Sequence, residues 1–206
     1  VAQEPELKTE EQKTLYAIGL IVSQNLAQFN LTPAELEIVK AGLTDAALKK
    51  DRKIVVQAYL PKTQEMQTAR LAAVAATEKK ASQAFLEKAA AEKGATKTPS
   101  GIVMTTIKPG TGATPKATDK VKVHYQGTLT DGTVFDSSIQ RNQPATFPLS
   151  GVIKCWTEGV QLMKVGGKSK LVCPSDLAYG DKGMPPRIKP GSTLVFEVEL
   201  LEIVNQ

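Results

Sequence analysis

The feature that most constrains this chain is a long run without Gly or Pro, from Lys62 to Lys93. The run is rich in Ala, Glu, Lys and Gln, which all have high helix propensity. It predicts one helix over residues 62–94, roughly 45 Å long at about 1.5 Å per residue, with Gly94 as its C-cap. Most of its apolar residues are alanines, so this helix cannot bury itself. Two interpretations stay open: a solvated spacer, or a stalk whose upstream helices dimerise.

The residues before this run are also predicted to be helical. Thr32 and Glu35 form a capping box, with Pro33 at the first helical position. Apolar residues recur at helical spacing on both sides of the box, namely Leu15, Ile18, Val22, Leu26 and Phe29 before it and Leu36, Val39 and Leu43 after it. Tyr16, Leu20 and Ile21 add a second apolar face. A short helix with two apolar faces must be covered on both sides.

The pattern changes from Ile102 onward. Apolar and polar residues alternate in VKVHYQG, and the dipeptide Asp131-Gly132 favours a tight hairpin turn. Two more β-rich runs, KSKLVC and STLVFEVELLEIV, are bounded by Gly and Pro. One short helix is expected over Thr157–Met163. We therefore predict an α+β chain, with helices in residues 1–61, the long helix in 62–94, and an antiparallel sheet wrapped around one short helix in 95–206.

Composition excludes several classes of protein. Apolar residues make up 41% of the 206 residues, which argues against global disorder. The 26 Lys and Arg are interleaved with 21 acidic residues, so no basic stripe for nucleic acid is expected. No stretch approaches the roughly 20 apolar residues that a membrane-spanning helix needs. The chain begins VAQEPELKTEEQ without Met, which suggests a removed signal peptide or a trimmed start.

Two cysteines, Cys155 and Cys173, are too few for a zinc site. Each lies in an apolar context, where a small buried side chain is a sufficient explanation. In an oxidising compartment the two could form a disulfide instead. Both interpretations stay open, because the sequence does not give the geometry of the pair.

A catalytic triad is one interpretation of His124, Asp136 and Ser137, which lie close together in the sequence. A nucleophilic serine needs a sharp elbow such as G-x-S-x-G and an oxyanion hole, and Ser137 lacks that glycine spacing. His124 alternates with Tyr125 on a predicted strand, so the two side chains point to opposite faces. These observations disfavour a hydrolase, and with a single His a metal site is also disfavoured.

Aromatic and branched residues gather near the turns of the second half: Tyr125, Phe135, Phe147, Val152, Ile153, Trp156, Tyr179, Ile188 and Phe196. Their spacing alone predicts only a packed core. Their order and context resemble a known family. VHYQGTLTDGTVFDSS, VIKCWTEGVQLMKVGGKSKL, LAYG and PGSTLVFEVELLEI closely resemble the FKBP-type peptidyl-prolyl isomerases, over residues 100–206.

The helical half is similar to one bacterial branch of that family, the macrophage infectivity potentiator (Mip) and FkpA branch. The similar segments are YAIGLIVSQNL and AFLEKAAAEKGATKTPSGI, on either side of the Ala-rich run. In that branch the N-terminal helices intertwine as a dimerisation domain. The resemblance therefore implies a V-shaped homodimer, with one FKBP-like domain on each stalk helix.

The resemblance also implies roles for individual residues. Trp156 would form the floor under the proline ring, Tyr179 would hydrogen-bond a substrate carbonyl, and Asp136 would accept polar contacts at the rim. The walls would be Tyr125, Phe135, Val152, Ile153 and Phe196, with Phe147 as an aromatic wall residue and Ile188 as an aliphatic contact.

This chain departs from the family pattern at four positions. Cys155 stands where the family usually has Gly, and Met184 replaces a larger residue of the long loop. Lys154 and Arg187 add positive charge near the rim. The segment from Arg141 to Trp156 is also shorter than in small single-domain relatives. No departure removes a predicted wall residue.

The implied activity is isomerisation of X-Pro bonds in unfolded or partly folded proteins, with neither cofactor nor covalent step. A chaperone role through the dimer is expected, as is binding of the family's macrolide inhibitors. The alternatives are an isomerase-inactive holdase chaperone and a surface adhesion factor. The resemblance places the protein in the periplasm, or at the outer membrane, of a Gram-negative bacterium.

Overall fold

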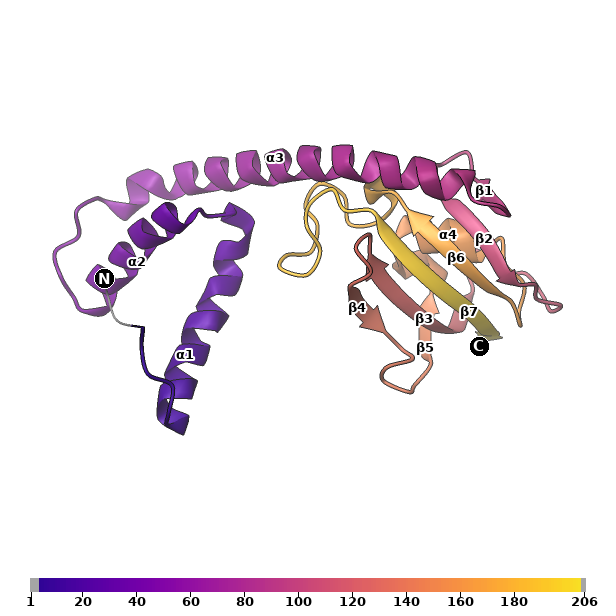
Figure 1. Cartoon of the computed structure of the whole chain (residues 1–206), viewed down its shortest axis with the longest axis horizontal. Coiled ribbons are helices and arrows are strands. Elements are labelled where there is room, and N and C mark those ends of the chain that lie inside the picture. Colours follow the sequence, from indigo (N-terminus) through magenta and orange to yellow (C-terminus); the bar gives the residue numbers. More distant parts are fainter. Residues whose placement is uncertain (1–3, 205–206) are drawn as a thin grey trace. The chain divides into compact units, whose positions relative to one another are not determined.

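The computed structural model describes residues 4–204, which divide into two compact units at the boundary between Leu71 and Ala72. The first unit is helical and the second is built on a sheet (Figure 1). Each unit is described below by itself. Within residues 4–204, no helix has both the length and the apolar character needed to cross a membrane.

The first unit contains α1 (Glu10–Ser23), the 3-10 helix η1 (Gln24–Phe29) and α2 (Pro33–Ala47). The predicted capping box is confirmed, since the Thr32 side chain accepts from Glu35 N–H and the Glu35 side chain accepts from Thr32 N–H. None of the residues of α1, η1 and α2 is buried. Large apolar side chains are instead exposed, among them Leu15, Tyr16, Ile18, Leu20, Ile21, Ile38 and Leu43. One copy of the chain therefore does not cover these apolar faces.

An ion pair joins α2 to the first part of the long helix. Arg70 donates from Nη1 to Glu35 Oε2 and from Nη2 to Glu35 Oε1, each at 2.8 Å. Its Nη1 also donates to the Phe29 carbonyl at 2.9 Å. The hydrogen bond from Arg70, supported by the Thr32 N–H, lowers the pKa of Glu35 from 4.5 to about 2. Arg70 thus holds together the end of η1, the start of α2 and the long helix.

This depressed pKa predicts a pH dependence of stability. The Glu35 carboxylate stabilises the helical unit fully above pH 4.5, and this contribution is lost as pH falls through about 2. We expect an NMR titration of the Glu35 carboxyl carbon to give a midpoint near 2, and Arg70→Gln to move it toward 4.5. An unchanged midpoint in Arg70→Gln would show that Arg70 does not set this pKa.

The long helix α3 spans Val56–Ala91. It begins upstream of Pro61, so the prediction of a helix start at residue 62 is wrong. A proline lacks one hydrogen-bond donor and crowds the carbonyl four residues before it, here that of Gln57. Gln57 lies in the first turn, so Pro61 removes one hydrogen bond near the start of the helix and affects only the turn before it.

The second half of α3 packs against the sheet of the second unit. Its buried residues, Ala75, Ser82 and Ala89, recur every seven residues and so form one stripe. Ala89 lies in a cluster with Val103 and Val172 of the sheet, and Phe85 and Leu86 pack against that cluster. This part of the helix is therefore not a solvated spacer, because its small residues allow close approach to the sheet.

Residues 178–192, which connect the end of the 3-10 helix η3 (Ser175–Leu177) to the last strand, also rest on α3. We call this segment the 178–192 loop. Lys79 Nζ lies 2.5 Å from Asp181 Oδ1. Gly191, with φ of 78°, lies so near Ala75 that a Cβ atom would collide with the Ala75 backbone carbonyl. Gly191 N–H also donates to the Gly180 carbonyl at 2.9 Å, which closes the base of the loop.

Seven described strands form one antiparallel sheet in the order β1-β2-β6-β7-β3-β4, with β5 paired to β3. The strands are β1 (Ala95–Lys97), β2 (Val103–Lys108), β3 (Lys120–Leu129), β4 (Val134–Ser137), β5 (Ala145–Pro148), β6 (Lys168–Cys173) and β7 (Leu194–Val204). The predicted Asp131-Gly132 hairpin joins β3 to β4, with Gly132 at φ of 89°. The alternation of β3 is also as predicted, since Val121, Val123 and Tyr125 are buried.

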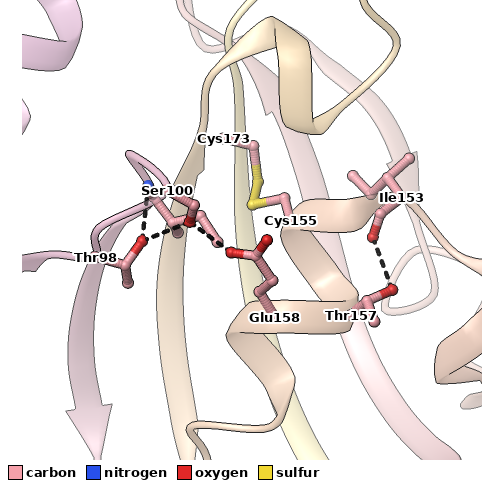
Figure 2. Close-up of a disulfide and its surroundings, with 8 residues drawn as sticks. Thr98, Ser100, Ile153, Cys155, Thr157, Glu158 and Cys173 are labelled. Atoms are coloured by element: carbon pink, nitrogen blue, oxygen red, sulfur yellow. Dashed lines mark hydrogen bonds between the residues drawn. A yellow bond between two sulfur atoms is a disulfide. The ribbon is translucent and has the colours of Figure 1, made fainter. Parts of the chain in front are cut away.

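One short helix, α4, packs on the sheet and spans Lys154–Val160. It starts three residues before the predicted Thr157, and two residues separate it from the 3-10 turn η2 (Leu149–Gly151). Cys155 of α4 and Cys173 at the end of β6 are joined by a disulfide, and both are fully buried (Figure 2). The disulfide fixes the start of α4 to the strand that leads into η3. It therefore ties together the two segments that flank the candidate site.

Candidate active site

Aromatic rings surround the single Trp of the chain. The Trp156 ring lies 5.1 Å from Tyr125, 5.6 Å from Phe147 and 5.4 Å from Phe196, each in an edge-to-face arrangement. Phe135 continues the cluster at 5.6 Å from Phe196. Such pairs contribute about 0.5–1.5 kcal/mol each beyond their area burial. The rings come from α4, β3, β4, β5 and β7, so the sheet and the helix together fix this apolar cluster.

All nine apolar residues predicted for the site lie in or against one core cluster: Tyr125, Phe135, Phe147, Val152, Ile153, Trp156, Tyr179, Ile188 and Phe196. Phe135, Phe147, Val152, Ile153 and Tyr179 are half-buried, which leaves part of each ring or aliphatic side chain available to a ligand. Trp156 is only 4% exposed and Ile188 only 1%. The half-buried residues are therefore the accessible rim, and Trp156 lies beneath them.

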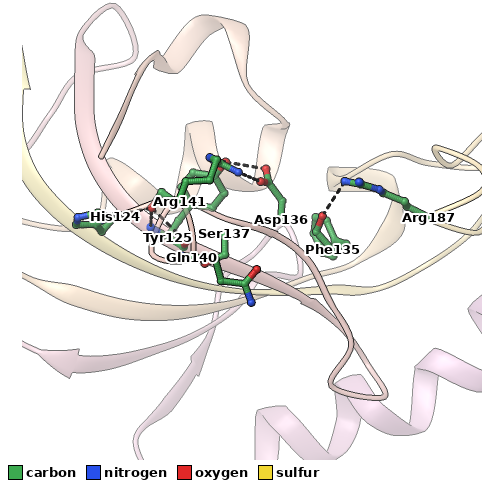
Figure 3. Close-up of polar contacts among 9 residues, drawn as sticks. His124, Tyr125, Phe135, Asp136, Ser137, Gln140, Arg141 and Arg187 are labelled. Carbon is green, nitrogen blue, oxygen red and sulfur yellow. Dashed lines mark hydrogen bonds and ion pairs between the residues drawn. The ribbon is translucent and has the colours of Figure 1, made fainter. Parts of the chain in front are cut away.

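Tyr125, Asp136 and Arg141 form a polar triad, which Figure 3 shows. Tyr125 Oη donates to Asp136 Oδ2 at 2.6 Å. Arg141 donates from Nη1 to Asp136 Oδ1 at 2.6 Å and from Nη2 to Tyr125 Oη at 2.9 Å. Burial opposes ionisation of Asp136, but the hydrogen bonds from Tyr125 and Arg141 outweigh it and hold the pKa of Asp136 below its ordinary value. A fixed carboxylate thus stands at the edge of an apolar cluster.

Arg141 is a member of the site that the sequence reasoning missed. It follows Asp136 by five residues, in the loop after β4. No local sequence motif indicates that an arginine in this loop will contact the strand that precedes it. Only the fold of this loop brings its guanidinium to Tyr125 and Asp136.

Tyr179 packs against the same core cluster as Trp156 and its neighbouring rings. Burial raises the pKa of the Tyr179 hydroxyl, and the nearby Asp136 charge raises it further. Among the hydrogen bonds of residues 4–204, none involves the Tyr179 hydroxyl. This hydroxyl is therefore protonated at neutral pH and is available to donate to a ligand.

The hydrolase interpretation does not fit the geometry. Ser137 is only 3% exposed, and its Oγ accepts from the Gln140 N–H at 3.2 Å. His124 Nδ1 lies 3.0 Å from Ser138 Oγ, not from Ser137. Ser138 is fully buried and accepts from the Tyr125 N–H at 2.7 Å. The His124–Ser138 contact therefore braces β3 and does not form an exposed nucleophile. No group of three or more potential metal ligands is found within residues 4–204.

Comparisons with known proteins agree with this architecture. The family model for FKBP-type peptidyl-prolyl cis-trans isomerase matches residues 112–201, and the model for the domain amino terminal to it matches residues 11–104. The chain therefore belongs to the FKBP-type peptidyl-prolyl cis-trans isomerases, and it is an enzyme of that class.

Two curated relatives match nearly the whole chain. The FKBP-type peptidyl-prolyl cis-trans isomerase FkpA of Aeromonas hydrophila is 44% identical over 98% of this chain and 80% of its own length. The FKBP-type 22 kDa peptidyl-prolyl cis-trans isomerase of Escherichia coli is 44% identical over 97% of this chain and 98% of its own length.

A solved structure is also similar, the crystal structure of FkpA from Escherichia coli. It has a TM-score of 0.70 and 37% identity, and the match covers 96% of this chain and 98% of that one. The α+β prediction, with helices first and an antiparallel sheet around a short helix second, is confirmed. So is the resemblance to the branch that includes FkpA.

Proposed function

We propose that the ring cluster and its polar rim are the site of X-Pro isomerisation. The proline ring sits over Trp156, between Phe135, Val152 and Ile153. Tyr179 donates its hydroxyl hydrogen to the carbonyl of the residue before proline. The observations that carry this proposal are the half-buried rings, the Asp136 carboxylate that Tyr125 and Arg141 hold in place, and a Tyr179 hydroxyl without a hydrogen-bond partner among residues 4–204.

The chemistry requires no nucleophile. Amide resonance keeps the X-Pro bond planar, with a rotational barrier of about 18–20 kcal/mol. At the transition state the amide is twisted and its resonance is lost, so it is less polar than the planar form. An apolar site therefore disfavours the planar ground state more than the twisted state. Binding the twisted form more tightly than either planar isomer accelerates the exchange.

The substrates proposed are unfolded or partly folded polypeptides that contain proline. The walls are apolar, so an apolar residue before proline is favoured. Lys154 and Arg187 are both exposed cations, and they disfavour basic residues nearby. An open rim of half-buried residues binds weakly and broadly, which suits clients of varied sequence.

The chaperone role rests on a homodimer. The uncovered apolar faces of α1 and α2 support it, because a second copy presents the same faces and buries them. By the family resemblance, the dimer is V-shaped, with one isomerase domain on each α3. Two sites on one particle raise the local concentration of client chain, so one domain can hold a client while the other acts on its proline.

The proposed location is the periplasm, or the outer-membrane surface facing it, of a Gram-negative bacterium. The disulfide between Cys155 and Cys173 supports this, because disulfides persist in oxidising compartments. The macrolide inhibitors of the family are proposed to bind the same ring cluster, with Tyr179 and Asp136 as their polar contacts.

The function is tested by comparing the whole chain with residues 72–206. Both should catalyse exchange of a short X-Pro peptide with similar kcat/KM, because the ring cluster lies entirely in the second unit. Only the whole chain should accelerate refolding of a proline-limited client and suppress its aggregation, and small-angle scattering should give it an extended two-armed profile. Equal chaperone activity in residues 72–206 would refute the role of the dimer.

A further inference from the structure

A hollow of about 440 Å³ adjoins the ring cluster but is separate from its floor. It is lined by Leu129, Thr133, Val134, Phe135, Asp136, Ser137, Gln140, Arg141 and Arg187. Phe135 and Asp136 belong to both the hollow and the proposed proline site. Its volume lies within the range of about 300–1,000 Å³ that ligand sites occupy. A polypeptide bound at the rings therefore has room to continue into this hollow.

The hollow follows the free edge of a strand. All four residues of β4, Val134–Ser137, line it. Successive side chains of a strand point to opposite faces, so a hollow lined by consecutive residues runs along the edge. β4 is the last strand in the sheet order and pairs only with β3 among the described strands. An extended segment fits such an edge.

The two arginines of the hollow differ in their electrostatic state. Arg141 is neutralised by Asp136 at 2.6 Å. Arg187 is exposed, and its Nη1 donates to the Phe135 carbonyl at 3.2 Å (Figure 3). No ion pair within residues 4–204 involves Arg187. A guanidinium has five N–H donors, so most of those of Arg187 remain available for a carboxylate.

The charges around the hollow leave it positive. Its lining contains Arg141, Arg187 and the single carboxylate of Asp136. In the 178–192 loop, Lys182 and Lys189 are exposed, and Asp181 is paired with Lys79. Asp131 at the β3–β4 turn accepts from the Thr133 N–H, and its pKa is lowered first by that bond and in part by Lys189. These charges favour an anionic occupant.

We propose that this hollow is a subsite for an acidic residue of the client, close in sequence to the proline, and that Arg187 is its specificity-determining residue. The backbone of the client lies along the β4 edge, and the carboxylate of a Glu or Asp pairs with the Arg187 guanidinium. The subsite rests on the proposed function, because it requires proline to be bound at the neighbouring rings. It selects among clients and takes no part in twisting the X-Pro bond.

The test uses capped peptides of the form X-Leu-Pro-Phe and Leu-Pro-Phe-X in which X is Glu, Gln or Lys, so that only the charge at X varies. NMR exchange spectroscopy gives kcat/KM for each peptide with the whole chain. At one of the two positions, we expect kcat/KM for the Glu peptide to exceed that for the Gln peptide by about three- to fivefold, which is the scale of an exposed ion pair. The Lys peptide should have the lowest kcat/KM. The Glu to Gln ratio should decline as salt rises from about 0.05 to 0.5 M, because salt screens exposed charges.

Three variants separate the subsite from a structural role of Arg187. Arg187→Gln should bring the Glu to Gln ratio to about 1, and Arg187→Lys should retain most of the preference. Lys182→Gln, which removes a charge from the same loop outside the hollow, should lower the ratio far less than Arg187→Gln does. The ratio within one variant is independent of its folded fraction, so partial unfolding does not obscure the result.

Two results would overturn the proposal: a wild-type ratio of 1 at both positions, or a preference for Glu that persists in Arg187→Gln. Absence of exchange activity on every peptide is a different outcome. It would overturn the proposed isomerase site itself, and with it the subsite.

Discussion

Asp136→Leu should lower kcat/KM for an X-Pro peptide tenfold or more, which corresponds to about 1.4 kcal/mol or more of transition-state stabilisation. The substitution removes a carboxylate that contacts both Tyr125 and Arg141. It also leaves the Arg141 guanidinium beside an apolar site without its partner, where the unpaired charge disturbs binding of an apolar ligand. The measurement is NMR exchange on the peptide, with near-UV circular dichroism as the check on folding.

Tyr125→Phe is the matched control. It removes the 2.6 Å hydrogen bond to Asp136 but keeps the ring that packs against Trp156. Arg141 continues to hold the carboxylate, so most of the activity should remain. A wild-type rate in Asp136→Leu would count heavily against the assignment of the rim, whatever the control shows.

The same assignment fixes how the rate depends on pH. The pKa of Asp136 is held below its ordinary value of 3.8. The carboxylate therefore stays mostly charged when the pH falls to that value. In the wild type, kcat/KM should therefore remain flat down to about this pH. Loss of activity at clearly higher pH, with the fold intact, would point to another group.

The second large effect is expected from Ile18→Asp combined with Ile21→Asp, which should convert the proposed dimer into a monomer. The two isoleucines are exposed on α1 at a spacing of three residues, and so lie on one face. Burying an aliphatic side chain of this size contributes about 1.5–3 kcal/mol. A dimer contains four such side chains, so replacing all of them should raise its dissociation constant at least about a thousandfold.

Light scattering measures this change, and Ser23→Asp is the control. Ser23 is an exposed polar residue of α1 two positions after Ile21, so it does not lie on the Ile18–Ile21 face, and a charge there should leave the dimer intact. Activity on a short peptide should be the same in all three proteins, because the ring cluster lies in the other unit. A monomeric wild type, or a dimeric isoleucine variant, would show that α1 is not in the interface.

The local features of the fold were predictable because each depends on neighbouring residues. The Thr32–Glu35 capping box, the alternation of β3 and the turn at Gly132 all follow from interactions within a few positions. The start of α3 was not predictable in this way. Whether a helix continues through Pro61 depends on where its first turn lies, and the sequence places that boundary poorly.

The candidate site was predictable only in part. Spacing alone indicated a core, and the assignment of Trp156 and its neighbours came from the family resemblance. Arg141 and Arg187 gain their positions from loops that fold back onto β4. Likewise, the alanines of α3 left a solvated spacer and a stalk both open, whereas Ala75 and Ala89 are buried where the helix packs against Gly191 and the sheet.

The contact between α3 and Gly191 has a consequence for how this enzyme can vary in length. Gly191 is hydrogen-bonded to Gly180, the neighbour of Tyr179. The helix at Ala75 therefore supports the position of Tyr179, a residue of the proposed catalytic rim. A helical turn added to or deleted from α3 after Ala75 would disturb this support, whereas a turn added before Leu71 would not. The length of α3 can therefore change without disturbing this contact only upstream of Ala75, because the residues from Ala75 onward already belong to the catalytic unit.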